Sequence, residues 1–168
     1  MNDSTTTYVI RLSGTVSTKA PRTRKRFTRR LVENIRDALD RNGVTYELDR
    51  EWARLFVESD DERAGIWLRR IFGVQGVRPS HRIDWDSLED LVRAGRKLYA
   101  DRVDGRSFGV DASRVGQREH FDFDSMDVNR ELGGALDQAG GSVDLDDPEV
   151  AVRLEVHADR AFFFDEEL

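Results

Sequence analysis

The sequence predicts an α+β protein built as two units, because strand-like and amphipathic helical stretches follow one another without a strict βαβα order. Of its 168 residues 38% are hydrophobic and 9% aromatic, which is enough for compact cores. Charge is uneven: residues 4–32 hold eight basic residues and no acid, whereas residues 119–168 hold fifteen acids against three arginines. Because the net charge is −6, this basic segment stands out and indicates one nucleic-acid-binding face.

The first half of the chain is expected to hold three strands and two helices. Residues 8–12 are rich in β-forming side chains and predict a strand. Pro21 fits a first helical turn, and apolar residues then recur at i, i+4 and i+8 until Asn42-Gly43 ends the helix. Residues 44–58 suggest two strands with a turn near 49–51, and a second amphipathic helix is expected to begin at 60–62 and to run through Ile71.

Two glycines near the middle, Gly73 and Gly76, predict a joint that divides the chain into units 1–74 and 75–168. A third helix is expected to start behind Asp84 or Asp86 as its cap and to reach Arg102. The remaining expected elements are a strand at 107–113, a loop at 114–123, a helix from Asp124 or Ser125 to Gly140-Gly141, and strands at 150–156 and 161–164.

Composition excludes several classes of protein. Because the chain has no cysteine, it forms no disulfide, uses no thiolate nucleophile and binds no zinc through cysteine. No apolar run suffices for a signal peptide or for the roughly 18 residues of a membrane span, so a cytoplasmic location is expected. No Walker-type glycine loop occurs, so the sequence predicts no nucleotide site.

Arginine greatly outnumbers lysine, since only three of the 27 basic residues are lysines. Excess acid with arginine in place of lysine resembles the proteins of salt-loving archaea, the haloarchaea. In molar salt the Debye length falls to about 3 Å, which screens simple attraction to phosphate. RNA binding would then depend on arginine forks and hydrogen bonds.

Four short segments occur in an order and spacing that are similar to one family. They are Lys19-Ala-Pro-Arg-Thr-Arg-Lys-Arg-Phe27, Ile71-Phe72-Gly73-Val74, the run from Phe121 to Gly134 with its Arg-x-x-Gly helix, and the run from Pro148 to Val156. Together they resemble the N-terminal half of the tRNA 4-thiouridine sulfurtransferases (ThiI). The resemblance covers nearly the whole chain.

This resemblance implies a fold and a function. It implies an N-terminal ferredoxin-like domain at 1–74 packed with a THUMP α/β domain at 75–168. It also implies a module that holds the acceptor stem and 3′ end of tRNA for thiolation by a catalytic pyrophosphatase-type domain, in cis or in trans. That domain's Ser-Gly-Gly-x-Asp-Ser loop is absent here, so ATP is expected only there, and this chain is expected to bind RNA and not to catalyse.

The basic segment and the resemblance together predict the RNA-binding residues. They are Lys19, Arg22, Arg24, Lys25, Arg26, Arg29, Arg30, Arg114, Arg118, His120 and Arg130. Asp122 and Asp124 depart from the family pattern and stand beside a helix N-terminus that could otherwise hold a phosphate. Direct phosphate capture is therefore not expected at that helix.

Other readings stay open. The basic cluster could be a solvated helix face. Further, His120, Asp122, Asp124 and Asp127 have side chains that can hold a divalent ion, which would suit a small metal-dependent hydrolase. A third possibility is a stand-alone THUMP adaptor for cytidine acetylation or methylation of tRNA.

Three structural expectations concern residues within these motifs. Phe121 and Phe123 alternate and are expected to pack into a core rather than to stack on bases. Gly133 and Gly134 are unfavourable inside a helix, so close packing of that helix on a sheet is expected to require them. One ring of Phe162-Phe163-Phe164 is expected to face outward.

Overall fold

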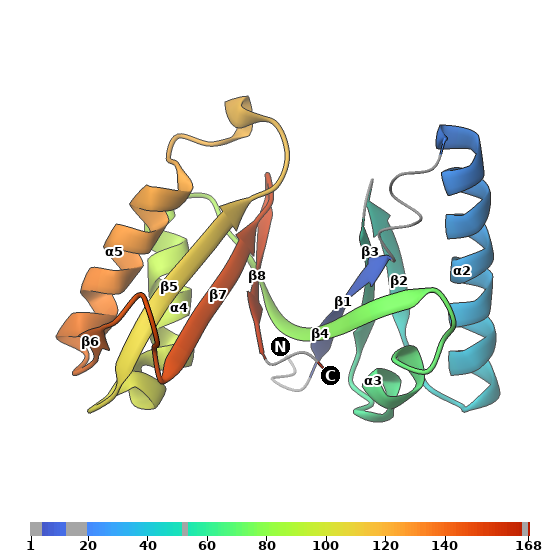
Figure 1. Ribbon diagram of the computed structural model, residues 1–168, viewed down its shortest axis with the longest axis horizontal. Coiled ribbons are helices and arrows are strands. Elements are labelled where there is room, and N and C mark those ends of the chain that lie inside the picture. Colours follow the sequence, from blue (N-terminus) through green and yellow to red (C-terminus); the bar gives the residue numbers. More distant parts are fainter. Residues whose placement is uncertain (1–4, 13–19, 52–53, 166–167) are drawn as a thin grey trace. The chain divides into compact units, whose positions relative to one another are not determined.

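The computed structural model describes residues 5–12, 20–51, 54–165 and 168 (Figure 1). Contacts divide the chain into two units, Met1–Ser80 with Asp165–Leu168, and His81–Phe164. Each unit has its own hydrophobic core. The α+β class predicted from the sequence is confirmed, whereas the division into domains at 1–74 and 75–168 stays a prediction.

The first unit has the βαββαβ order of a ferredoxin-like fold. Its elements are β1 (Thr6–Leu12), α2 (Pro21–Arg41), β2 (Glu47–Glu51), β3 (Arg54–Ser59), α3 (Arg63–Leu68) and β4 (Val74–Asp84). The strands pair antiparallel in the order β2-β3-β1-β4. Both helices lie on the same side of this sheet (Figure 1).

One stripe of α2 holds that helix on the sheet. Leu31, Ile35 and Leu39 are at most 2% exposed and pack with Ile10 of β1 and Leu55 of β3. Their spacing of four residues places them on one side of the helix, so every other face is left toward solvent. The buried stripe therefore fixes which side chains of α2 can meet a ligand.

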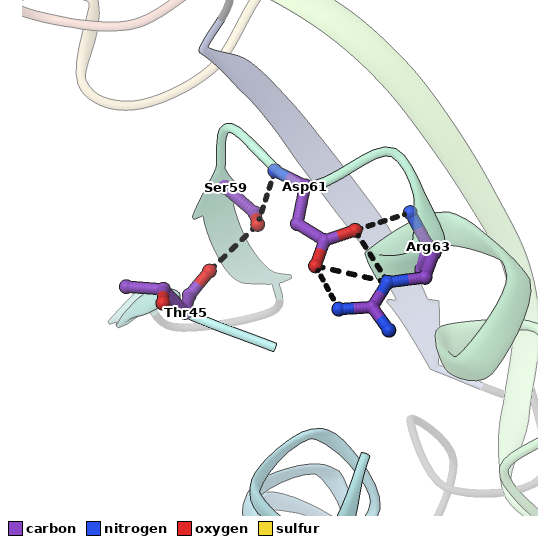
Figure 2. A network of polar contacts seen from close by, with 4 residues as sticks. All are labelled: Thr45, Ser59, Asp61 and Arg63. Atoms are coloured by element: carbon purple, nitrogen blue, oxygen red, sulfur yellow. Dashed lines mark hydrogen bonds and ion pairs between the residues drawn. The ribbon is translucent and has the colours of Figure 1, made fainter. Parts of the chain in front are cut away.

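A polar network fixes the start of α3 (Figure 2). Ser59 Oγ donates to the Thr45 carbonyl at 2.7 Å and accepts from Asp61 N–H at 3.1 Å. The Asp61 carboxylate accepts from the backbone N–H of Arg63 and forms an ion pair with its guanidinium, Nη2 to Oδ2, at 2.6 Å. These contacts with Arg63 lower the pKa of Asp61, and they tie the helix to the end of β3.

In the second unit two helices cover one face of a mixed sheet (Figure 1). Its elements are α4 (Leu88–Val103), β5 (Ser107–Arg114), the 3₁₀ helix η1 (Arg118–His120), α5 (Ser125–Gln138), β6 (Ser142–Val143), β7 (Val150–Val156) and β8 (Arg160–Phe164). The strand order is β8-β7-β5-β6, in which β5 runs parallel to β6 and β7 while β7 and β8 are antiparallel.

The start of α4 corrects a predicted cap. The N-cap is Ser87, not Asp84 or Asp86. Asp90, in the first turn, accepts from the backbone N–H groups of Asp86 at 3.0 Å and of Ser87 at 3.2 Å. The bond from Asp86 is the main cause of the lowered pKa of Asp90. The Asp90 carboxylate, inside the helix, therefore accepts hydrogen bonds from the backbone before the helix, so no aspartate is needed at the N-cap position.

Other predicted boundaries also change. The turn is not at 49–51, since β2 continues through Glu51, and α3 ends at Leu68 rather than Ile71. The strands β4 and β6 were not predicted, because Gly73 before β4 and Gly76 within it suggested a joint, and β6 has only two residues. All three rings of Phe162-Phe163-Phe164 are buried, contrary to the expectation of one outward ring.

Candidate nucleic-acid interface

The predicted basic segment becomes the outer surface of α2. Arg22, Lys25, Arg26, Arg29 and Arg30 are all exposed, whereas Arg24 is half-buried. The first five are named the α2 basic surface. Lys19, which was predicted with them, lies outside the described residues.

Within the described part of the chain, no carboxylate forms an ion pair with any residue of the α2 basic surface. Some arginines elsewhere in the chain are paired. Arg41, in the last turn of α2, lies 3.6 Å from Asp37, and Arg93 on α4 lies 3.2 Å from Asp90. The α2 basic surface therefore keeps its charges available to an external anion.

Hollows beside these side chains add one residue that the sequence did not single out. One hollow of about 390 Å³ is lined by Arg26, Phe27, Arg29, Arg30 and neighbours. A second, of about 570 Å³, includes Arg50 of β2 in its lining, and Arg50 also lines a third of about 360 Å³. The basic surface thus extends from α2 to β2. The sequence did not predict that Arg50 joins this basic surface, because its neighbours in sequence are acidic and its position beside α2 depends on the tertiary fold.

The N-cap residue of α2 provides no side-chain cap. The N-cap is Ala20, no acid occurs in the first turn, and Pro21 occupies the start. The first N–H groups of a helix have no intrahelical partner and carry partial positive charge. This end of α2 therefore adds to the positive potential of its arginines.

The predicted contacts of the second unit are partly engaged within the fold. Arg114 Nη1 donates to the Phe123 carbonyl at 2.7 Å, and its guanidinium lies 5.3 Å from the Phe121 ring centre. Arg118 and His120 are exposed on η1. Arg114 therefore supports the loop, whereas Arg118 and His120 extend into solvent.

Phe121 and Phe123 pack as expected. Their rings contact Trp85, with centroid distances of 6.0 Å and 5.3 Å, and both belong to the core of the second unit. Trp85 Nε1 in turn donates to the His157 carbonyl at 2.9 Å. These half-buried rings pack against the core and help to hold the loop in place.

The start of α5 is satisfied by its own acids. Asp127 N–H donates to Asp124 at 2.8 Å, and Asp124 N–H donates to Asp127 at 2.9 Å. Arg130 lies 2.6 Å from Asp127 and 3.7 Å from Glu131. The backbone bond from Asp124, followed by Arg130, lowers the pKa of Asp127. Direct phosphate capture is therefore disfavoured here, and Arg130 is paired.

The expectation for the two helical glycines was wrong. A Cβ atom at Gly133 or Gly134 would meet nothing within 4 Å, so close packing does not require glycine there. Both glycines instead line a hollow of about 550 Å³, together with exposed Met126 and Leu145.

Two further findings concern the described residues alone. They contain no group of three or more His, Asp or Glu side chains that could hold a metal ion, and Asp124 and Asp127 serve as helix caps. In the same residues, no helix has the length and apolar character needed to cross a membrane.

The fold and two matched families define the class of this protein. Residues 7–77 match the ThiI ferredoxin-like domain, and residues 85–164 match the THUMP domain. The chain therefore has a ThiI ferredoxin-like domain followed by a THUMP domain, as the sequence segments predicted.

Curated relatives of this chain include tRNA sulfurtransferases. A probable tRNA sulfurtransferase of Sulfurisphaera tokodaii is 29% identical over 94% of this chain and 40% of its own length. The probable tRNA sulfurtransferase of Saccharolobus solfataricus is 32% identical over 93% of this chain and 40% of its own length. The chain is thus homologous to tRNA sulfurtransferases and spans about 40% of their length. These relatives do not bear out a salt-adapted source, which stays a prediction.

Solved structures share the fold. PH1313 from Pyrococcus horikoshii has a TM-score of 0.81 at 24% identity, with 97% of this chain and 54% of that chain covered. A 4-thiouridine synthetase solved with RNA and bound ATP has a TM-score of 0.73 at 23% identity, with 97% and 41% covered. At such identities the likeness shows the fold.

Proposed function

We propose that this chain is a tRNA-binding module that holds the acceptor stem and 3′ end of tRNA for 4-thiouridine formation by a catalytic domain. The observation that carries the proposal is the α2 basic surface, whose five cations have no ion-pair partner among the described residues of an acid-rich chain. Arg50 widens this surface beyond one helix. Unpaired arginines are suited to phosphates, which they bind through two parallel hydrogen bonds.

Homology supports the choice of RNA. The related tRNA sulfurtransferases act on tRNA by name, and a solved 4-thiouridine synthetase of the same fold is bound to RNA. The match to the ThiI type of ferredoxin-like domain favours thiolation over acetylation or methylation. In this proposal the chain supplies binding, while ATP and chemistry belong to the catalytic domain.

Charge reversal on α2 tests the proposal. Replacing Arg22, Arg26 and Arg30 by glutamate removes several phosphate contacts, each worth about 1.5–3 kcal/mol as a charge-assisted hydrogen bond. Filter binding with whole tRNA should show a loss of at least about 100-fold. The matched control reverses three charges on α4, Arg93, Arg96 and Lys97, and should change affinity little. Equal losses in both variants would show that net charge alone is responsible.

The choice of acceptor stem has its own test. A minihelix with an acceptor stem and a 3′ overhang should compete as well as whole tRNA, whereas a blunt duplex of the same length should not. Single-stranded ends expose base edges and faces that a duplex hides. Equal competition by the blunt duplex would reduce the function to general binding of RNA backbones.

A further inference from the structure

Phe72 has the most exposed large hydrophobic side chain among the described residues, at 90%. It follows α3 and precedes β4 in the first unit. Scattered exposed hydrophobic residues are ordinary on proteins. This one differs in two respects: its backbone is held rigidly, and its neighbours are cationic.

The turn that carries Phe72 is fixed at both ends. Val74 N–H donates to the Ile71 carbonyl at 3.2 Å and closes a four-residue turn with Phe72 at its second position. Gly73, at the third position, has φ +96°, as a type II turn requires. A Cβ atom at Gly73 would lie 3.1 Å from Cζ of Phe27, so the turn packs tightly on α2. The ring is therefore held in solvent by a packed backbone.

Two arginines precede this turn in the first unit. Arg69 and Arg70 are exposed just before the turn, and the Arg70 guanidinium lies 5.2 Å from the Trp67 ring centre. Within the described residues Arg69 has no ion pair. Phe27, against which Gly73 packs, lines the same hollow as Arg26 and Arg30. The turn lies beside α2 (Figure 1), close to Phe27, which lines the same hollow as three cations of the α2 basic surface.

We propose that Phe72 stacks on an unpaired nucleobase of the RNA whose backbone lies on the α2 basic surface. This inference rests on the proposed function and assigns a second kind of contact to the same surface. An exposed aromatic ring on a unit that also carries exposed arginines suits a nucleic acid, because the ring takes the base face while the cations take the flanking phosphates. Phenylalanine has no hydrogen-bonding group, so stacking accepts any base.

Charge complementarity favours RNA over a protein as the partner of Phe72. An apolar segment of a protein partner would have to bury its contact beside Arg69, Arg70 and the α2 cations, which is unfavourable without matching acids. RNA brings a flat apolar surface and negative charge together. The structure therefore favours an unpaired base.

The experiment uses the full chain and three RNA probes: a blunt duplex, the same duplex with a 3′ overhang, and the same duplex with a one-nucleotide bulge. In the last two the unpaired base is 2-aminopurine, whose fluorescence reports stacking. Phe72→Ala should weaken binding of the overhang or bulge probe about 5- to 100-fold and leave the affinity for the blunt duplex unchanged. It should also restore the 2-aminopurine fluorescence that stacking on Phe72 quenches. Phe72→Trp should retain affinity and quenching.

Two controls separate stacking from other effects. Ile66→Ala removes another exposed hydrophobic side chain of the same unit, 48% exposed, and should change nothing. Phe72→Leu keeps apolar area but lacks a ring, so it should behave as Phe72→Ala does. Full binding by Phe72→Leu, or equal affinity of Phe72→Ala and the parent chain for every probe, would overturn the inference.

Failure of this inference differs from failure of the proposed function. If charge reversal on α2 abolishes binding while Phe72→Ala has no effect, only the stacking contact is wrong. If charge reversal has no effect on any probe, the α2 basic surface is not the RNA site and the proposed function fails. Loss of binding to the blunt duplex in Phe72→Ala would also overturn stacking, since that probe has no unpaired base.

Discussion

The helices α2 and α5 begin in opposite ways. Before α2 stands Ala20, which makes no side-chain capping hydrogen bond, and the five cations of the α2 basic surface lack ion pairs in the described residues. Before α5 stands Asp124, which forms a reciprocal cap with Asp127, and Arg130 is paired with Asp127. Both helices carry arginine, but only α2 leaves it available. Pairing, and not the presence of arginine, therefore distinguishes the two helices.

The difference has a cost in stability. Cations near a helix N-terminus oppose the helix dipole, and an uncapped first turn leaves N–H groups without partners. In α5 an acid, Asp127, lies in the first turn, where its negative charge interacts favourably with the helix dipole. The sequence of α2 therefore gives up local stability where an anion can restore it, a trade typical of functional surfaces.

The largest effect that separates the two helices is expected from single charge reversals. Arg26→Glu should weaken tRNA binding at least about 10-fold, because one charge-assisted contact is lost and a repulsion is added. Arg130→Glu should weaken it less than about 2-fold, because that guanidinium is already held by Asp127 at 2.6 Å. Filter binding at one salt concentration measures both. Similar losses would place α5 in the interface as well.

Capping provides the second contrast. Ala20→Asp should raise the free energy of unfolding by about 0.5–2 kcal/mol, and Asp124→Ala should lower it by a similar amount. Urea unfolding measures both changes. Ala20→Asp should also weaken tRNA binding, since it places an acid beside the α2 basic surface.

Ala20→Ser is the matched control for that variant. Serine caps a helix without charge, so it should stabilise the fold and leave tRNA binding unchanged. If Ala20→Ser weakens binding as much as Ala20→Asp does, the free N–H groups and not the cations are the binding feature of α2.

Periodicity predicted much of this fold. The spacing of Phe27, Leu31 and Ile35 predicted α2 and its buried side, and the position of Asp124 predicted the cap of α5. Both depend on residues a few positions apart, where local geometry decides the outcome. Elements of this kind can be derived from one sequence because their energetics are local.

Other features needed the tertiary structure. Arg50 joins the basic surface because β2 lies near α2 in space, and its own sequence neighbours are acidic. The strand β4 was hidden by Gly76, which suggested a joint although the residue pairs with Arg11 of β1. Both features depend on contacts between residues far apart in the sequence, so local patterns could not predict them.

Glycines give the third contrast between the two regions. Gly133→Ala should stabilise the protein by up to about 1 kcal/mol, because alanine favours helix and a Cβ atom there meets nothing within 4 Å. Gly73→Ala should destabilise it by about 1–2 kcal/mol, because φ there is +96°. Urea unfolding of both variants measures the signs. A stabilising Gly73→Ala would mean that the turn holding Phe72 is not rigid.

The smallest effect is expected in the pH dependence of the two helix starts. The Asp124 N–H and Arg130 lower the pKa of Asp127 below 3.8, so its contribution to stability is full above that value and disappears as pH falls through the lowered pKa. Unfolding of the parent chain and of Asp127→Asn, measured between pH 7 and about pH 3, should therefore differ most at neutral pH and converge in acid. The gain from Ala20→Ser should stay constant over the same range, because serine does not ionise and α2 has no acid in its first turn. If the difference in free energy of unfolding between the parent chain and Asp127→Asn stays constant with pH, Asp127 caps α5 through hydrogen bonding alone. The charge of Asp127 would then not contribute to the difference between α5 and α2.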